Sequence, residues 1–296
     1  MLGSENVFYK YLSPASSILV LENRTLKWSN ARLFNDPFDM PIDTSFAFDG
    51  RSLATALIDE LTILSFGDEE PKGDASNQCF ASCLITRRAR EHGATEDELR
   101  NALTGCVDKI SESFPNLLQR YEAHLKDMRD SFALLCVSKT NENLLMWSHY
   151  AKDHTGCVLG LRCRPDLDRP LCAVKPVEYL REFPLRATLP EYVKHLTGQV
   201  ELDEEKVFQR FAFAKGADWQ YEQEWRGMSE LHDRVNGYDF DPLIADELDT
   251  VYFGAKIDQG NREQLLALLK REYPNTKIVQ ARLSRQRYAL EFENVG

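Results

Sequence analysis

Several signatures of familiar protein classes are missing from this sequence. No apolar run approaches the about eighteen residues that a membrane-spanning helix needs, and the first residues lack the basic and apolar regions of a signal peptide. Gly-x-Gly-x-x-Gly, Walker-type, Gly-x-Ser-x-Gly and His-Glu-x-x-His motifs are absent too. These absences count against membrane proteins and against the common dinucleotide-binding, NTPase, esterase and zinc-protease classes.

Basic residues are also scarce relative to acidic ones. The chain has 36 Lys and Arg against 47 Asp and Glu, which gives a net charge of −11. Such a chain repels nucleic acids and anionic membranes unless a local basic patch offsets the charge. We therefore expect no membrane partner and no bulk nucleic-acid binding.

The cysteines do not form an obvious disulfide or metal-binding pattern. Their number, seven, is odd, and some of them lie in apolar runs such as residues 133–137. This usage is typical of reduced, buried thiols, so we expect a cytoplasmic protein. His149 and His154, with Cys157 nearby, lack the paired spacing of zinc ligands, and we expect no metal.

Strand-like and helix-like segments alternate in blocks along the chain. Apolar residues at helical spacing predict a helix over 50–66, and a Thr95-x-x-Glu98 capping box starts a helical stretch over 95–128 that Pro115 interrupts. A further helical zone covers 190–214. Short runs rich in β-prone residues predict strands at 7–11, 25–29, 78–84, 132–138, 157–163, 173–180, 222–229, 249–253, 277–283 and 287–292.

This order of elements predicts the fold class. Strands separated by blocks of helices indicate an α+β protein. With no low-complexity linker or repeat to mark a boundary, we expect residues 1–296 to form a single α+β domain with a split, mixed or antiparallel sheet. The segments at about 95–128 and 190–214 are then helical inserts.

A pair of glutamates near the end of the chain is the first candidate for chemistry. On a strand, Glu222, Glu224 and Arg226 would share one face, with the carboxylates about 7 Å apart. Two carboxylates beside an arginine suit the stabilisation of a cationic, oxocarbenium-like centre. The alternative is a solvated strand face with a cross-strand ion pair. The flanking aromatic residues Trp219, Tyr221 and Trp225 indicate either a core edge or a stacking surface.

Residues 141–156 form a second candidate, a polar and aromatic segment between two apolar strands. Loops held by a rigid sheet are frequent ligand sites, so this segment is a candidate pocket wall. Alternatively, Trp147 and Tyr150 pack into the core and His149 is a structural histidine.

The third candidate combines the N-terminal residues 8–12 with Lys27-Trp28-Ser29 and the stretch 34–39. Tyr9 and Tyr11 would lie on one strand face and Lys10 on the other, so Lys10 either faces an anion in a cleft or extends into solvent. Asn35-Asp36-Pro37 is typical turn chemistry.

Together these stretches resemble the bacterial family catalogued as domain of unknown function 2971. The motifs that carry the resemblance are Tyr9-Lys10-Tyr11, Phe34-Asn35-Asp36-Pro37-Phe38-Asp39, Met146 to Gly156, and Lys215 to Arg226. More loosely, a Tyr-x-Tyr strand, a following Ile-Leu helix and a late Glu-x-Glu are similar to ADP-ribosyltransferase-like proteins. Lys10 stands where those proteins carry His or Arg.

That looser resemblance implies an NAD-consuming ADP-ribosyltransferase or NAD glycohydrolase, an effector in bacterial conflict or phage defence that acts on an unknown macromolecular acceptor. It implies that Glu224 holds the ribose and stabilises the cationic sugar, while Glu222 orients or deprotonates the acceptor. The implied catalytic residues are Glu224, Glu222 and His149, and the implied residues that bind the nucleotide NAD are Lys10, Tyr11, Asn35, Trp147, Tyr150 and Arg226. Trp147 or Tyr150 would stack on nicotinamide. The competing expectation is a non-catalytic ligand-binding or sensing module.

Overall fold

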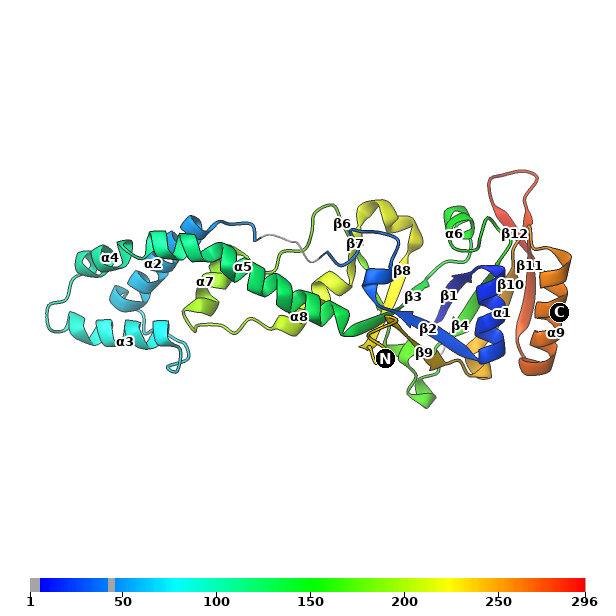
Figure 1. The fold of residues 1–296 in the computed structure, drawn as a ribbon, viewed down its shortest axis with the longest axis horizontal. Coiled ribbons are helices and arrows are strands. Elements are labelled where there is room, and N and C mark those ends of the chain that lie inside the picture. The colour runs from blue at the N-terminus through cyan, green and yellow to red at the C-terminus, as the bar shows by residue number, and fades with distance from the viewer. Residues whose placement is uncertain (1–5, 42–45, 296) are drawn as a thin grey trace. The chain divides into compact units, whose positions relative to one another are not determined.

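The computed structural model describes residues 6–41 and 46–295 (Figure 1). The chain divides into two compact units, each made from more than one segment of sequence. The first unit comprises the segments up to residue 40, 129–182 and from 213 onward, and the second comprises 41–128 and 183–212. The expected helical inserts lie in the second unit. The expectation of a single domain stays a prediction.

The first unit is built on a mixed β-sheet. Its strands follow the order β12-β11-β10-β4-β1-β3-β2-β9, β8 pairs with β3 and β5 pairs with β8. Neighbouring strands are antiparallel except β10 and β11, so the expectation of an α+β protein with a mixed sheet is confirmed. The strands are β1 (Val7–Leu12), β2 (Thr25–Ser29), β3 (Phe132–Ser138), β4 (Cys157–Arg162), β5 (Lys175–Pro176), β8 (Glu224–Glu230), β9 (Tyr238–Pro242), β10 (Leu248–Phe253), β11 (Lys277–Leu283) and β12 (Leu290–Asn294). A separate parallel pair joins β6 (Glu178–Leu180) to β7 (Ala214–Gly216).

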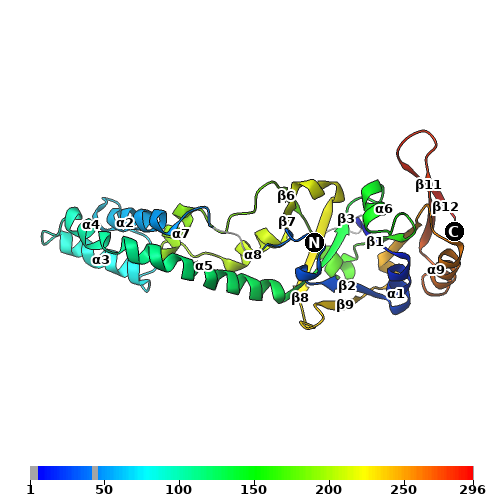
Figure 2. The same cartoon turned by 45° about the horizontal axis from the view of Figure 1, so that its top comes forward.

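Helices cover both faces of this sheet. Helices α1 (Pro14–Asn23) and α9 (Gln259–Glu272) lie side by side in Figures 1 and 2. Leu21 of α1 and Leu265, Leu268 and Leu269 of α9 are buried in the larger apolar core, to which β1 contributes Phe8. Helix α6 (Leu144–His149) packs in a smaller cluster that includes Tyr11. Alternating strand residues thus bury apolar side chains on both faces, and this holds β1 between two packed layers.

The second unit is helical. Its helices are α2 (Gly50–Phe66), α3 (Gln78–Arg90), α4 (Glu96–Thr104), most of α5 (Val107–Asp130), α7 (Leu189–Leu196) and α8 (Glu204–Ala212). An aromatic cluster that includes Phe46, Phe114 and Tyr192 fills part of its core. The predicted Thr95 capping box is present at the start of α4. None of the helices formed by residues 6–41 and 46–295 is long and apolar enough to cross a membrane.

Two local predictions are wrong. Residues 78–84, predicted as a strand, begin α3, because the Asn77 side chain accepts hydrogen bonds from the backbone of Cys79 and Phe80 and caps a helix. Pro115 does not interrupt its helix but lies inside α5. Burial of the neighbouring Phe114 in the aromatic cluster offsets the lost backbone hydrogen bond.

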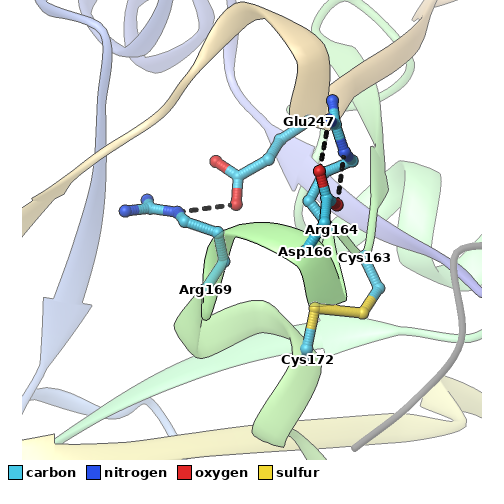
Figure 3. Close-up of a disulfide and its surroundings, with 6 residues drawn as sticks. All are labelled: Cys163, Arg164, Asp166, Arg169, Cys172 and Glu247. Carbon is cyan, nitrogen blue, oxygen red and sulfur yellow. Dashed lines mark hydrogen bonds and ion pairs between the residues drawn. A yellow bond between two sulfur atoms is a disulfide. The ribbon is translucent and has the colours of Figure 1, made fainter.

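The expectation of reduced thiols is wrong for two of the seven cysteines. Cys163 and Cys172 form a disulfide, with 5.1 Å between their Cα atoms (Figure 3). The intervening segment folds back through two short 3-10 helices, at Pro165–Leu167 and Pro170–Ala173. Arg164 binds Asp166 and Arg169 binds Glu247 in the same region. This fold-back brings the two thiols together, and the spacing of the cysteines in the sequence does not reveal it.

Candidate functional site

A cavity of about 170 Å³ lies in the first unit. Strands β1, β2 and β3 form part of its wall, the Phe34–Asp39 turn and the α6 region form a second part, and the chain from β7 to β8 forms the rest. Its polar lining comprises Tyr9, Lys10, Tyr11, Lys27, Ser29, Asn35, Asp39, Cys136, Ser138, Tyr150, Lys215, Glu222 and Glu224.

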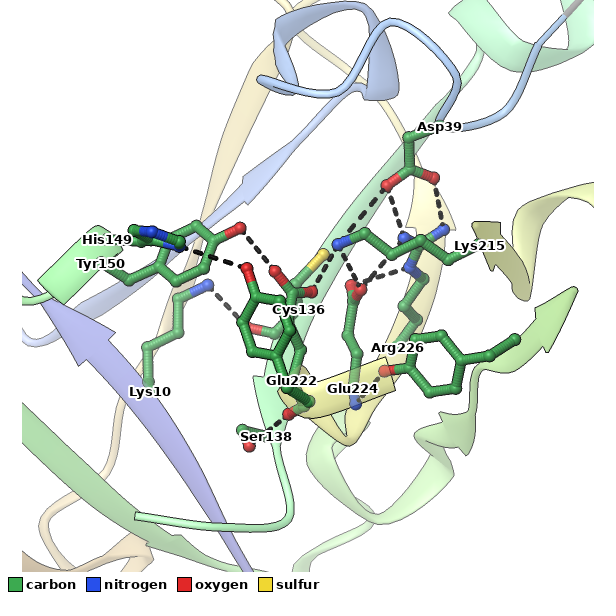
Figure 4. Close-up of polar contacts among 12 residues, drawn as sticks. Lys10, Asp39, Cys136, Ser138, His149, Tyr150, Lys215, Glu222, Glu224 and Arg226 are labelled. Atoms are coloured by element: carbon green, nitrogen blue, oxygen red, sulfur yellow. Dashed lines mark hydrogen bonds and ion pairs between the residues drawn. The ribbon is translucent and has the colours of Figure 1, made fainter. Parts of the chain in front are cut away.

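The two candidate glutamates converge here by a route other than the predicted one. Glu222 ends a 3-10 helix, Ala217–Glu222, and Gln223 adopts a left-handed conformation with φ of 45° before β8 begins at Glu224. The prediction that both glutamates lie on one strand face is therefore wrong. They meet because the Lys215 ammonium on β7 donates to both, at 2.5 Å from Glu222 Oε2 and 3.0 Å from Glu224 Oε2 (Figure 4).

Glu224 belongs to a buried ion network. The Arg226 guanidinium, which is 0% exposed, donates from Nε to Glu224 Oε1 at 2.8 Å and from its two terminal nitrogens to Asp39 at 2.9 and 2.6 Å. Glu224 itself is only 6% exposed. The alternative of a solvated strand face is therefore wrong. Breaking a buried pair leaves an uncompensated charge, so each member of this network holds the others in place.

The network shifts the two glutamate pKa values in opposite directions. Burial raises the pKa of Glu222, and the opposing charge of Lys215 does not cancel the effect. Burial acts in the same sense on Glu224, but the charges of Arg226 and Lys215 outweigh it and hold the pKa of Glu224 well below its ordinary value. Neighbouring carboxylates with divergent pKa values are typical of sites that divide acid–base and charge-stabilising work.

Tyr150 connects α6 to this pair. Its hydroxyl donates to Glu222 Oε1 at 2.6 Å, and burial raises the pKa of Tyr150 above its ordinary range. Met146 and Tyr150 are four residues apart on the same helical face, and both line the cavity.

The other two α6 candidates lie elsewhere. Trp147 is 0% exposed and packs edge-on against Tyr11, while its indole nitrogen donates to the Asn141 carbonyl at 2.7 Å. His149 is exposed and shares a hydrogen bond with the Tyr221 hydroxyl at 3.1 Å. Neither residue lines the cavity, because helical spacing turns residues 147 and 149 away from the face of Met146 and Tyr150.

The N-terminal candidates do line the cavity. Lys10 Nζ donates to the Cys136 carbonyl at 2.7 Å, and the Tyr11 hydroxyl donates to the Thr140 carbonyl at 2.9 Å. Asn35 is exposed and also lines the cavity. Arg226, by contrast, does not line the cavity and contacts the lining residues Glu224, Asp39 and Phe34 from behind.

Asp39, Lys215 and Lys27 lay in candidate stretches of the sequence, but sequence reasoning predicted no role for them. Asp39 is the last residue of one motif that carries the family resemblance, and Lys215 is the first residue of another. Their places in these motifs were the available signal. Lys27 stands in no such motif. Only the tertiary fold brings these side chains to one cavity.

No group of three or more His, Cys, Asp and Glu residues within 6–41 and 46–295 is arranged to hold a metal ion. The three carboxylates at the cavity, Asp39, Glu222 and Glu224, are instead bound to Lys215 and Arg226. The expectation that no metal is needed stays a prediction.

The family model described as Protein of unknown function (DUF2971) matches residues 146–227. This segment is less than a third of the chain and runs from α6 into β8, so it contains Tyr150 and both glutamates. The match supports the resemblance to that family. No curated protein and no solved structure matches the chain, and the resemblance to ADP-ribosyltransferase-like proteins is left without support.

Proposed function

We propose that this protein cleaves the bond between nicotinamide and ribose in NAD, as an ADP-ribosyltransferase or NAD glycohydrolase, and that Glu222 and Glu224 carry the chemistry. The observation behind the proposal is the pair of carboxylates with oppositely shifted pKa values, joined by Lys215 in one cavity. Of the two, Glu224 is the fixed negative charge and Glu222 is the group that exchanges a proton.

The proposed reaction balances as follows. The bond between ribose C1′ and the nicotinamide nitrogen breaks, and its electron pair leaves with nicotinamide. The ribose that remains carries positive charge, which the ionised Glu224 stabilises because a fixed charge in a buried site needs no reorganisation. Water or an acceptor group then attacks C1′ and loses its proton to Glu222. A raised pKa brings Glu222 closer to the pH at which proton transfer is efficient.

Tyr150 supports this role for Glu222. Its hydroxyl holds one carboxylate oxygen of Glu222, and Lys215 holds the other, so the proton acceptor has a fixed orientation. Tyr150 lines the cavity, and its ring could contact an aromatic base bound there. A cavity of about 170 Å³ is smaller than the roughly 300–1,000 Å³ of most small-molecule sites. We propose that it receives only the nicotinamide–ribose end of NAD, with the adenosine end outside.

One observation favours the second candidate, a non-catalytic ligand-binding or sensing module. Both oxygens of Glu224 and both oxygens of Glu222 already have hydrogen-bond donors from the chain itself. Fully satisfied buried networks often serve to specify a unique packing.

Incubation with NAD distinguishes the two candidates. Free nicotinamide is measured by chromatography over time at several protein concentrations, and NAD binding is measured in parallel by calorimetry. Release that rises in proportion to protein supports the enzyme. Binding without release supports the module, and the absence of both overturns the proposal. The unknown acceptor is sought by adding bacterial lysate and radiolabelled NAD to the active protein.

A further inference from the structure

The lysines of the cavity fall into two groups. Lys215 is ion-paired with Glu222 and Glu224. Lys10 and Lys27 also line the cavity, but within the described parts of the chain neither forms a salt bridge with a carboxylate. An ammonium group without a counter-charge in a cavity is suited to binding an anion.

Lys10 is held at the point where strands separate. Strand β3 is paired with β1 at Ser138 and with β2 at Leu134, and the Cys136 carbonyl between these two points accepts a hydrogen bond from Lys10. An ammonium group has three N–H donors, and this bond uses one. Two donors therefore remain for a ligand, on a side chain whose position is fixed by the sheet.

Lys27 approaches the same cavity from β2. Its neighbours Leu26 and Trp28 are buried in the core, so strand alternation places Lys27 on the opposite face. Its ammonium lies 4.0 Å from the centre of the Tyr238 ring, and this cation–π contact orients it. Burial is the largest cause of the lowered pKa of Lys10, and the positive charge of Lys27 lowers that pKa further.

We propose that Lys10 and Lys27 form an anion subsite that binds the phosphate of a ribose-phosphate ligand, with the ribose directed toward Glu222 and Tyr150. The orientation of the ribose rests on the proposed function, but the anion subsite does not. A phosphate monoester carries up to two negative charges near neutral pH, and the pyrophosphate of NAD carries one on each phosphate, so either matches two ammonium groups. The substrate class is then a mononucleotide, or the nicotinamide mononucleotide half of NAD.

Calorimetry with ribose 5-phosphate and with ribose tests the subsite. The wild-type protein is expected to bind ribose 5-phosphate at least about tenfold more tightly than ribose, as charge-assisted hydrogen bonds imply. Lys27→Ala is expected to remove most of that difference and to leave ribose binding unchanged. Lys27 is exposed, so the fold tolerates the change. Lys10→Met, which keeps the aliphatic stem, is expected to act in the same direction.

Lys270→Ala is the matched control, because Lys270 is exposed on α9 and does not line the cavity. It is expected to bind both ligands like the wild type. Equal affinity for the two ligands in the wild type, no detectable binding, or an unchanged preference in Lys27→Ala would each overturn the subsite. A protein that binds ribose 5-phosphate through Lys27 but releases no nicotinamide would retain the subsite and overturn the proposed enzymatic function.

Discussion

Glu222 and Glu224 stand two residues apart yet differ in what surrounds them. Glu224 accepts from Arg226 and Lys215, two cations, whereas Glu222 accepts from one cation and the neutral Tyr150 hydroxyl. This imbalance of positive charge explains why the pKa of Glu224 falls and that of Glu222 rises although both side chains are buried. The Glu-x-Glu pattern alone does not distinguish the two glutamates, whereas their different neighbours in the fold do.

The first prediction concerns stability. Glu224→Gln is expected to lower the free energy of unfolding by about 3 kcal/mol, because it removes the carboxylate shared by the fully buried Arg226 and by Lys215. Urea unfolding measures the change. Glu178→Gln, at an exposed position on β6, is the control and should lie within about 0.5 kcal/mol of the wild type. A loss below 1 kcal/mol for Glu224→Gln would show that the network is not a structural unit.

The second prediction concerns the pH dependence of nicotinamide release. Glu222 must be ionised to accept a proton, so kcat/KM should fall as the pH drops through its raised pKa. The Tyr150 hydrogen bond favours the ionised form and lowers that pKa, so Tyr150→Phe should move the acidic limb to higher pH.

Tyr288→Phe provides the control for the hydroxyl deletion, since this tyrosine is fully exposed. Its acidic limb should coincide with that of the wild type. If the acidic limb of the kcat/KM profile of Tyr150→Phe coincides with that of the wild type, the group whose ionisation controls the rate is not Glu222.

At the scale of elements, hydrophobic patterning predicted most of the architecture. The helix predicted over about 50–66 is present as α2, because its leucines recur at helical spacing over four turns. The short apolar run at 78–84 fits either a strand or a buried helix, and only the Asn77 cap decides between them. Gln223 gave no signal for a left-handed backbone, so the turn between Glu222 and Glu224 escaped prediction.

The site shows a different limit of sequence reasoning. The family motifs contained Glu222, Glu224 and Asp39, but Asp39 is 187 residues from its partner Arg226. Periodicity describes neighbours within one element, whereas this ion pair depends on where a loop and a strand meet in the folded chain.

The third prediction tests the packing of α2 against α5. A Cβ at Gly50 would lie 2.8 Å from Phe114 Cβ and 2.9 Å from Ser111 Cα, which cannot rotate away. Gly50→Ala should therefore lower the free energy of unfolding by about 1–3 kcal/mol. Gly105, at the end of α4, has a φ of −64° and open space around its Cα, so Gly105→Ala should raise stability by about 0.5 kcal/mol. Thermal and urea unfolding measure the stability of both variants. If both substitutions change stability by the same amount, the close packing of α2 against α5 at Gly50 is contradicted.

The fourth prediction concerns the disulfide-closed segment. The Cys163–Cys172 bond spans nine residues and is expected to contribute roughly 2–3 kcal/mol by restricting the unfolded chain. A reductant should therefore lower the Tm of the wild type, but not that of the Cys163→Ala/Cys172→Ala variant. Cys106→Ala, which removes a free thiol, should keep the sensitivity to reductant. Thiol titration checks that reduction is complete, and an unchanged wild-type Tm after complete reduction would refute the prediction.

At the scale of the whole molecule, all of the lining residues of the cavity belong to the first unit. Three separate chain segments supply them, so the cavity exists only when that unit is folded. The net charge of −11 repels anions over the molecule as a whole, and Lys10 and Lys27 offset it locally. This contrast favours a small anion that enters the cavity over a long polyanion that binds the surface.

The most direct test of the proposed function is nicotinamide release from NAD by the wild type, Glu222→Gln and Glu178→Gln at equal concentrations, each shown to be folded by circular dichroism. We predict that the wild type and Glu178→Gln release nicotinamide at the same rate, and that Glu222→Gln is slower by on the order of a hundredfold or more. No release from the folded wild type, or equal release from Glu222→Gln, would contradict the proposal that Glu222 exchanges the proton in NAD cleavage.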